Sequence, residues 1–322
     1  MLDLLVFHNK NDRDLKVDKF ASKFPNLNIK SILFNESSTK LSIYPEISKI
    51  FINQFSKSID TEAKLYIYHP TFYDNRCTSL YHAEVDKDYE SYVYGEWQVV
   101  AEYVEFYLES FGKWINKPSA SRRAKNKIFQ LSVAKQHGLY VPKSIITNDA
   151  EAINNFIDGD IGIHKSISES GVINNELVSR TSMFSKSEID EDSGIDITPG
   201  CFQEFIDSDV ELRTYIAGNS AITVVLKPQD KFLIPDIRSQ PKNEQFFSIS
   251  NNFSQYEKTL INLIQSIDLK YAAIDSIVTE HGITFLELNP SGSWEWLPHD
   301  VSQIVWEFYW QFILRYLNGA ES

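Results

Sequence analysis

Three oxygen-bearing side chains near the C-terminal end of the sequence have the types and spacing that bind a metal ion. Asp275 and Glu287 each interrupt an apolar stretch, and Asn289 follows Glu287 by two positions. A buried carboxylate is costly unless it is paired with a cation or bound to a metal. Carboxylate and amide oxygens are ligands that Mg²⁺ prefers, and Mg²⁺ commonly shares its coordination shell with nucleotide phosphates. These residues therefore predict a magnesium site.

The elements expected around these residues would bring them together. Residues 272–279 and 283–288 have the apolar pattern of two strands joined by a short turn, so we expect an antiparallel hairpin. Side chains two positions apart on a strand face the same side. Glu287 and Asn289 then point together, and Asp275 reaches them from the partner strand. The alternative is that both carboxylates lie on the solvated face of the hairpin.

Three cations from distant parts of the sequence could together neutralise a triphosphate. Lys127 lies near a predicted helix, Lys165 ends an apolar strand, and Arg213 lies within a third segment. The planar guanidinium of an arginine can bind two oxygens at once. Taken alone, each of these residues is more often a solvated surface cation, so the prediction depends on the whole set.

The sequence lacks the glycine-rich phosphate-binding loops of the common nucleotide folds. It has no Gly-Lys-Ser/Thr loop of the Walker type and no G-x-G-x-x-G after a strand. If ATP binds, a different scaffold must hold it. The backbone of residues 202–206 could contact an adenine edge, and Glu211 could bind ribose hydroxyls, although spacing alone supports this only weakly.

Composition limits the class of protein. The chain has 322 residues, enough for more than one domain, and a formal net charge of −13, which argues against broad binding to nucleic acid or anionic membranes. Cys77 and Cys201 give neither a disulfide framework nor a zinc spacing, so we expect a reducing, cytoplasmic setting. The apolar run 1–7 has no basic flank and is expected to be a strand, not a signal peptide.

Periodicity predicts a mixed α and β chain. A strand, a helix and a strand in residues 1–34 suggest a βαβ unit, and residues 114–118 mark the first domain boundary. The predicted strands are 1–7, 29–34, 65–68, 144–147, 161–165, 202–206, 213–217 and 221–226, besides the hairpin. The predicted helices are 17–24, 94–111, 121–137, 254–267 and 300–317.

These segments, in this order, resemble the ATP-grasp superfamily, and more narrowly the ATP-grasp ribosomal-peptide maturases known as graspetide or microviridin-type ligases. The resemblance covers roughly residues 94–300. The residues that carry it are Trp114 to Pro118, Asn126-Lys127, Gln130-Leu131, Ala134, Gly138-Leu139, Val141-Pro142, Ile146 to Asn148, Phe202 to Glu204, Glu211 to Arg213, Asp236 to Arg238, Ala273 to Asp275, Glu287 to Gly292, and Trp294.

The resemblance implies an α+β, ATP-grasp fold. An N-terminal pre-ATP-grasp α/β domain (1–115) would precede a central lobe (116–200) and a C-terminal lobe with the metal site (201–322), and the two lobes would sandwich ATP. It implies roles for eleven residues: Lys127 and Lys165 at the ATP phosphates; Gln203, Glu204 and Ile206 at adenine; Glu211 at ribose; Arg213 and Arg238 at the γ-phosphate and the activated carboxylate; and Asp275, Glu287 and Asn289 at Mg²⁺.

The resemblance is incomplete in the N-terminal part. A strand that often carries a Tyr-Arg-Arg motif in this group here has the sequence Tyr66-Ile67-Tyr68-His69-Pro70. Contacts expected from those arginines therefore do not transfer to this chain.

The resemblance implies an ADP-forming ligase with ATP and Mg²⁺ as cofactors. It would form an acyl phosphate on Asp or Glu side chains of a ribosomal precursor peptide, leader plus core, and then ester or amide links to Ser, Thr or Lys. One alternative is a ligase for a small amino acid or peptide, similar to glutathione synthetase or ribosomal-modification enzymes. Another is a non-catalytic nucleotide or peptide binder. A homodimer is left open, and so is whether Trp294 and Trp296 pack internally or line the acceptor site.

Overall fold

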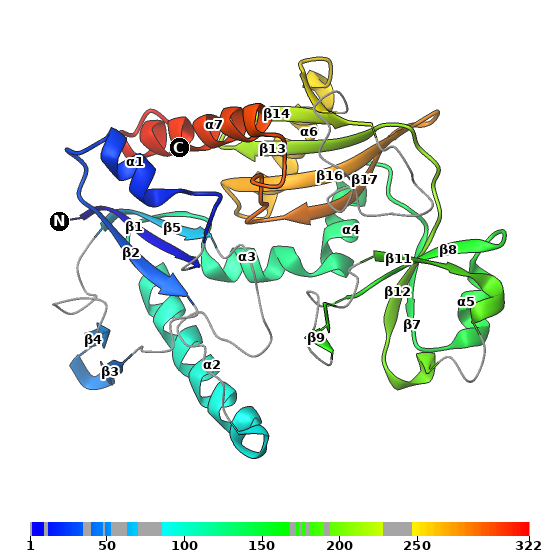
Figure 1. Cartoon of the computed structure of the whole chain (residues 1–322), viewed down its shortest axis with the longest axis horizontal. Helices are drawn as coiled ribbons and strands as arrows, with labels where there is room; N and C mark the ends of the chain where they lie inside the picture. The colour runs from blue at the N-terminus through cyan, green and yellow to red at the C-terminus, as the bar shows by residue number, and fades with distance from the viewer. Residues whose placement is uncertain are drawn as a thin grey trace.

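The computed structural model describes residues 2–9, 12–34, 40–47, 49–52, 63–69, 86–167, 172–173, 176–177, 181–189, 194–227 and 247–321. Three larger sheets organise these residues. Figure 1 shows a parallel sheet near the N-terminus, a five-stranded sheet beneath α7, and a smaller sheet at the opposite end, with α3 and α4 running between them.

The N-terminal sheet is parallel and has the strand order β2-β1-β5-β6. Its strands are β1 (Leu2–Asn9), β2 (Ile29–Phe34), β5 (Ala63–His69) and β6 (Lys113–Ile115). Alternate residues of β1 face opposite sides, because side chains on a strand have a period of two. Leu5 and Phe7 pack toward α2 (Lys87–Glu109), whereas Leu4 and Val6 share a core with α1 (Val17–Lys23) and α7 (His299–Leu317). Both faces are covered, as is typical of parallel sheets.

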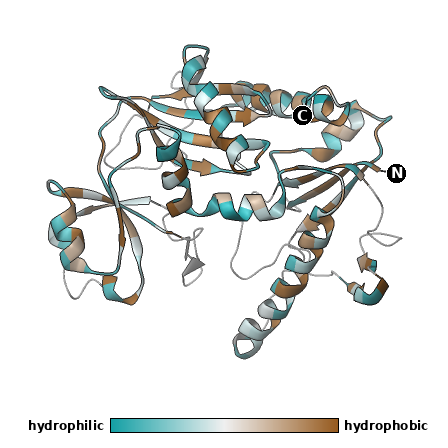
Figure 2. Ribbon diagram, turned by 180° about the vertical axis from the view of Figure 1, so that it is seen from behind, coloured by the Kyte–Doolittle hydropathy of each residue, from teal (hydrophilic) through white to brown (hydrophobic). Residues whose placement is uncertain are grey.

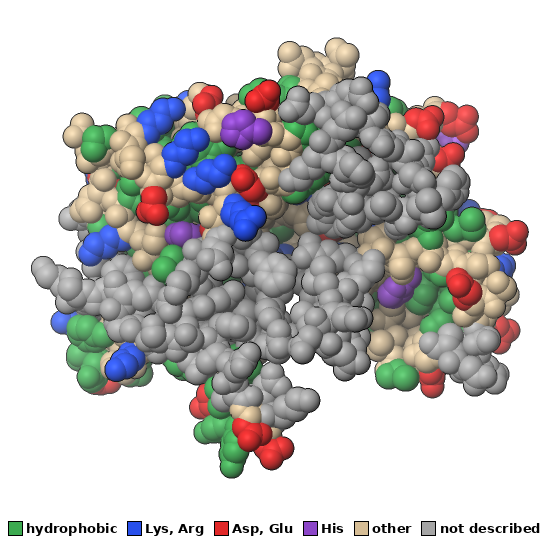
Figure 3. All heavy atoms as spheres, in the orientation of Figure 1, with side chains coloured by type: hydrophobic (Ala, Val, Ile, Leu, Met, Phe, Trp, Pro, Cys, Tyr) green, Lys and Arg blue, Asp and Glu red, His purple; other side chains and the backbone are tan. Residues whose placement is uncertain are grey.

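Helix α1 joins this sheet to α7. The Phe20 ring stacks on Trp310, with the ring centroids 3.7 Å apart. Lys19 and Lys23 lie over the Trp306 ring, 4.7 and 5.8 Å from its centroid. Figure 3 shows Lys and Arg side chains gathered over this part of the surface. The aromatic C-terminal helix is therefore part of the core.

The central sheet is antiparallel and has the strand order β15-β14-β13-β16-β17. Its strands are β13 (Glu211–Ala217), β14 (Ser220–Leu226), β15 (Phe247–Ser250), β16 (Tyr271–Thr279) and β17 (Gly282–Asn289). One face packs on α6 (Ser254–Ser266) through Leu212, Ile216 and Ile274. The other face packs on α7 through Tyr215 and Ala217.

The smaller sheet has the strand order β11-β8-β12-β7 and is antiparallel. Its strands are β7 (Ser144–Thr147), β8 (Ile161–Lys165), β11 (Thr181–Ser185) and β12 (Gly200–Glu204). Helix α5 (Ala150–Phe156) packs on one face, where Ile153 meets Phe202 and Ile145. Residues 205–210 link this sheet directly to β13 of the central sheet.

The predicted helix 121–137 is two helices, so that prediction was wrong. Helix α3 (Pro118–Lys125) ends at Asn126, whose side chain accepts a hydrogen bond from the Phe129 N–H and caps α4 (Lys127–Gln136). An Asn at this position can satisfy the free N–H groups of a new helix start. Figure 2 shows that α3 is largely hydrophilic, whereas the strands of the sheets beside it are largely hydrophobic.

Asn116 holds the chain just before α3 against the central sheet. Its side chain is buried, accepts hydrogen bonds from the backbone N–H groups of Lys270 and Tyr271, and donates to the carbonyls of Tyr271 and Pro290. The Asn116 side chain thus forms hydrogen bonds with backbone groups at the start of β16 and just after the end of β17. These are the two strands that carry the predicted metal ligands.

Several other elements differ from expectation. Strands β6 and β11 and helix α5 were not predicted, and α2 begins earlier than expected. Two short hairpins complete the described strands: β3 (Leu41–Tyr44) with β4 (Lys49–Ile52), and β9 (Val172–Ile173) with β10 (Glu176–Leu177). Within the described ranges, no helix is both long and apolar enough to cross a membrane. The domain boundaries at 115 and 200 stay predictions.

Candidate functional site

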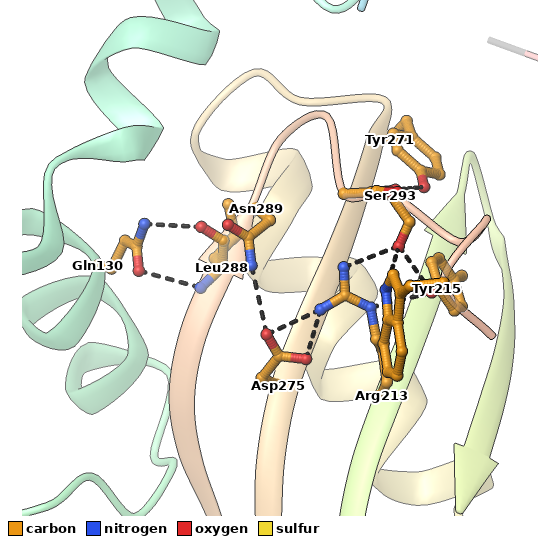
Figure 4. Close-up of polar contacts among 10 residues, drawn as sticks. Gln130, Arg213, Tyr215, Tyr271, Asp275, Leu288, Asn289 and Ser293 are labelled. Atoms are coloured by element: carbon orange, nitrogen blue, oxygen red, sulfur yellow. Dashed lines mark hydrogen bonds and ion pairs between the residues drawn. The ribbon is translucent and has the colours of Figure 1, made fainter. Parts of the chain in front are cut away.

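A row of charged residues crosses three neighbouring strands of the central sheet. Arg213 on β13 is the cross-strand partner of Asp275 on β16, and Asp275 is the partner of Glu287 on β17. These side chains share the face that α7 covers farther along the strands, where Tyr215 and Ala273 are buried. Figure 4 shows Asp275 and Arg213 pointing toward one another on this face. The alternative of a fully solvated hairpin face is not what the structure has.

An irregularity in β17 brings Glu287 to Asp275. From the turn, the pairing runs regularly to Ser276 opposite Phe285, and then shifts by one residue, so that Asp275 lies opposite Glu287 and Leu286 is left over. A β-bulge of this kind moves the following residues to the other face of the sheet. Phe285 and Leu288, three positions apart, are consequently both buried toward α6. Without the shift, Leu286 would lie opposite Asp275.

Arg213 is buried, 4% exposed, and its donors are largely engaged. Its Nη1 donates to Oδ1 and Oδ2 of Asp275 at 2.6 and 2.8 Å, and its Nε donates to the Tyr215 hydroxyl at 2.9 Å. Its Nη2 donates to the Ser293 carbonyl at 3.1 Å. Burial alone would lower the pKa of Arg213, but the charges and hydrogen bonds of Asp275 and Tyr215 together outweigh burial and raise that pKa.

Asn289 completes the predicted ligand set. Its Nδ2 donates to Asp275 Oδ2 at 3.3 Å, and the amide oxygen is the atom that could bind a metal ion. The three predicted ligands therefore lie together, with oxygen donors only. Among the described residues, no group of three or more His, Cys, Asp or Glu residues is arranged to hold a metal ion. Two carboxylates and an amide fit Mg²⁺ that takes its remaining ligands from phosphates and water, because Mg²⁺ requires an octahedral shell.

The segment after β17 covers the metal-ligand end of the sheet. Trp294 is fully buried and packs against Tyr215, Tyr271 and Tyr309, so its role is packing. Trp296 is half-buried, and its ring lies 5.5 Å from the guanidinium carbon of Arg213.

Lys127 is held beside β17 through its own helix. It is the first residue of α4, and Gln130, one turn later, is buried against the edge of β17. Gln130 Nε2 donates to the Leu288 carbonyl at 2.7 Å, and its Oε1 accepts from the Leu288 N–H at 2.9 Å (Figure 4). The side chain completes the edge of β17 as a further strand would.

Lys165 on the smaller sheet interacts with the carboxylates. It is 8% exposed at the end of β8 and lies opposite Cys201 of β12. Burial lowers its pKa most strongly, while the charges of Glu287 and Asp275 raise it and that of Lys127 lowers it further. Lys127 and Lys165 are therefore within electrostatic range of each other, and Lys165 is within range of both carboxylates. The charges of both predicted groups therefore act on the buried Lys165 side chain.

The residues expected at adenine and ribose lie along the link between the two sheets. Gln203 is buried on β12 and donates to the Ser144 hydroxyl at 2.8 Å. Glu204 ends β12 and accepts a hydrogen bond from the Lys143 N–H. Ile206 follows in the linking segment, and Glu211 begins β13. Arg238 lies outside the described residues.

Three contributors were missed as functional residues. Gln130 was part of the resemblance, but nothing in the sequence indicated that its side-chain amide would form hydrogen bonds with the edge of a strand. The Ser293 carbonyl is a backbone group and has no sequence signal. Asp14 accepts three hydrogen bonds from residues 293–295. The two acidic residues after the first strand, Asp12 and Asp14, gave no sign of these contacts.

No family model matches the sequence, and no curated protein sequence matches it. The structure, in contrast, is similar to solved structures over nearly its whole length. The macrocyclase MdnC bound with precursor peptide MdnA, from Microcystis aeruginosa, gives a TM-score of 0.75 at 22% identity, covering 97% of this chain and 100% of that one. A RiPP-associated ATP-grasp ligase from Chryseobacterium gregarium, in complex with ADP and a leader and core peptide, gives 0.72 at 18% identity, covering 100% and 98%.

A solved structure with lower similarity shares the overall fold over nearly the whole chain. D-alanine–D-alanine ligase from Bacillus anthracis gives a TM-score of 0.56 at 12% identity, covering 99% of this chain and 98% of that one. The chain therefore has the α+β ATP-grasp fold, as the resemblance implied, and its TM-scores are higher with the two peptide-bound structures than with D-alanine–D-alanine ligase.

Proposed function

We propose that this protein is an ATP- and Mg²⁺-dependent carboxylate ligase that acts on a ribosomal precursor peptide. The observation that carries the proposal is the pairing of Asp275 with Glu287 and Asn289, within electrostatic range of buried Lys165. The similarity to a macrocyclase bound with its precursor peptide supports the peptide as substrate. The similarity to PsnB, complexed with a minimal precursor, Mg and ADP, supports the cofactors.

The reaction activates a carboxylate, which is a poor electrophile at neutral pH. The γ-phosphoryl group of ATP passes to an Asp or Glu side chain of the peptide, giving an acyl phosphate and ADP. A Ser or Thr hydroxyl, or a Lys amine, then attacks the acyl carbon, releases phosphate and loses its proton. The product is an ester or amide cross-link that closes a ring.

The chain's own residues supply charge and position. Asp275, Glu287 and Asn289 would hold the magnesium ion, which neutralises charge on the transferring phosphoryl group. Lys127 and Lys165 would bind phosphate oxygens, and burial of Lys165 strengthens its electrostatic interactions. Gln203, Glu204 and Ile206 would contact adenine, and Glu211 ribose. Arg238 would face the activated carboxylate.

Arg213 needs a narrower role than the sequence predicted. Its Nη1 is used by Asp275 and its Nε by Tyr215, so within the described contacts it has little capacity to bind two phosphate oxygens. We propose that Arg213 acts mainly by fixing Asp275, and that it offers at most one N–H to the phosphoryl group or the acceptor.

The decisive experiment uses a precursor peptide encoded beside the gene. Purified protein with ATP and Mg²⁺ should lower the peptide mass by one water per cross-link, measured by mass spectrometry. Glu287→Gln should slow this by about 100-fold or more, because a ligand charge is lost. Glu280→Gln, at the exposed turn of the same hairpin, is the matched control and should leave the rate unchanged. Full activity of Glu287→Gln would contradict the proposed metal site.

A ligase for a small amino acid or peptide is the second candidate, favoured by the similarity to D-alanine–D-alanine ligase. ATP consumption with free amino acids, but unchanged precursor mass, would support it. A non-catalytic nucleotide or peptide binder would consume no ATP with either substrate. The cytoplasmic location and a homodimer stay predictions.

A further inference from the structure

Asp14 is a buried carboxylate that lies far from the metal ligands in sequence. It is 3% exposed and follows β1 of the N-terminal sheet. Its Oδ1 accepts three hydrogen bonds: from the Ser293 hydroxyl at 2.9 Å, the Trp294 N–H at 2.8 Å and the Glu295 N–H at 2.8 Å. Hydrogen bonds to an ionised acceptor are the stronger kind. Asp14 therefore fixes the backbone of residues 293–295.

The segment that Asp14 fixes presents one carbonyl to the charged row. The Ser293 carbonyl accepts from Arg213 Nη2 at 3.1 Å, from the Tyr215 hydroxyl at 3.0 Å and from Trp296 Nε1 at 3.0 Å. Arg213 in turn donates to both oxygens of Asp275. A continuous series of contacts thus joins Asp14, through Ser293 and Arg213, to Asp275.

The same segment has little freedom on its sheet side. A Cβ added to Gly292 would lie 2.2 Å from the Ala273 Cβ, and the Tyr271 hydroxyl donates to the Gly292 carbonyl at 2.7 Å. The backbone there lies directly on β16, two residues from Asp275. Gly292 is thus held against β16, whereas Ser293 and the two residues after it are held by Asp14.

We propose that Asp14 is a positioning residue for the metal site: by fixing the Ser293 carbonyl it orients Arg213, and Arg213 orients Asp275. The inference rests on the proposed function, because it concerns Mg²⁺ that is bound together with nucleotide. Without Asp14, the Arg213 Nη2 loses a fixed acceptor in a buried site, and the guanidinium turns toward whatever acceptor remains. Asp275 then offers its oxygens in a changed direction.

The test measures ADP binding by calorimetry at a series of Mg²⁺ concentrations, and so does not depend on catalysis. Asp14→Ala should raise the Mg²⁺ concentration that gives half-maximal ADP affinity by about tenfold, which corresponds to about 1.4 kcal/mol. Asp14→Asn keeps an oxygen at the same position and should recover most of the loss. Ser293→Ala removes one of the three donors and leaves the backbone contacts, so it should shift the value in the same direction by about threefold.

The matched control separates positioning from stability. Asp149 also accepts backbone N–H groups, at 2.9 and 3.2 Å, but at the start of α5 on the outer side of the smaller sheet. Asp149→Ala should lower the melting temperature without changing the Mg²⁺ dependence.

The results distinguish a failure of the positioning role of Asp14 from a failure of the proposed function. If Asp14→Ala folds and binds ADP with the wild-type Mg²⁺ dependence, the inference is wrong. If Asp14→Ala does not fold, an unshifted Ser293→Ala decides against it in the same way. If the wild type shows no Mg²⁺-dependent ADP binding, the proposed function fails instead.

Discussion

At the scale of the single residue, Arg213 lies beside the predicted metal ligands, and its guanidinium is bound within the protein. The sequence placed an arginine in a strand near the metal ligands, and its guanidinium was expected to bind two oxygens of a phosphate. In the structure the oxygens that it binds belong to Asp275. The Arg213 guanidinium is buried, and an unpaired buried charge is strongly destabilising, so the carboxylate beside it is its partner. The charged row is therefore already neutralised in part before nucleotide binds.

Asp12 gives a prediction for pH dependence. Its Oδ1 accepts from the N–H groups of Asp14 and Leu15, and burial, with added repulsion from Asp14 and Glu295, raises its pKa from 3.8 to about 7. Between these values the folded protein keeps a proton that the unfolded chain has lost, so stability falls as pH rises through this window.

Asp12→Asn keeps the accepting oxygen and does not titrate. We expect it to remove that fall and to stabilise the protein at neutral pH by on the order of 2 kcal/mol. Urea denaturation at a series of pH values between about 4 and 8 measures this. Asp300→Asn, at the exposed start of α7, controls for the loss of one negative charge. A pH profile in Asp12→Asn that still matches the wild type would contradict the assignment.

At the scale of elements, apolar patterning between turn residues was sufficient to place several strands and one helix. Strands β2, β7 and β8 have the predicted bounds, and α6 and the β16–β17 hairpin differ by a residue or so. The break at Asn126 was missed because an Asn can stand inside a helix or cap one. Strand β6 is too short to have a period.

The link between α4 and β17 gives a second prediction. Gln130 uses its whole amide on backbone groups: the two atoms of Leu288 and the Ala124 carbonyl. Gln130→Met keeps the volume but leaves these buried groups unsatisfied, which should cost about 2 kcal/mol.

Hydrogen exchange provides the local measurement for Gln130→Met. The Leu288 amide should exchange markedly faster, because Gln130 Oε1 is its acceptor. Gln136→Met, on the exposed end of the same helix, should change neither stability nor exchange at Leu288. Unchanged protection of Leu288 in Gln130→Met would show that α4 is held to β17 by apolar packing alone.

At the scale of the whole molecule, the site combines residues from two different sheets. The carboxylates lie on the central sheet and Lys165 lies on the smaller one. The short link 205–210 joins β12 of the smaller sheet to β13 of the central sheet. The sequence could predict which residues have this chemistry, since oxygen ligands and cations are distinctive in apolar strands. It could not predict Asp14 or the Ser293 carbonyl, because long-range contacts to a backbone group leave no pattern in composition.

This distribution predicts that metal and nucleotide bind together. Three protein oxygens are only part of an octahedral shell, so millimolar Mg²⁺ alone should hardly change the melting temperature. Mg²⁺ with ADP should raise it by several degrees, because a ligand that binds only the folded state stabilises it. Differential scanning fluorimetry with EDTA as the control measures both. Equal stabilisation by Mg²⁺ without ADP would indicate a self-sufficient metal site.

The left-over residue in β17 has a consequence for comparing this chain with others. Before Leu286 the odd-numbered residue Phe285 faces α6, and after it the even-numbered Leu288 does. An alignment to a protein with an unbroken hairpin must therefore open a one-residue gap at this point. If the gap is placed on the wrong side of Glu287, a core position of one protein is aligned with a ligand position of the other. The alignment then shows Glu287 without an acidic counterpart, although the two structures have one.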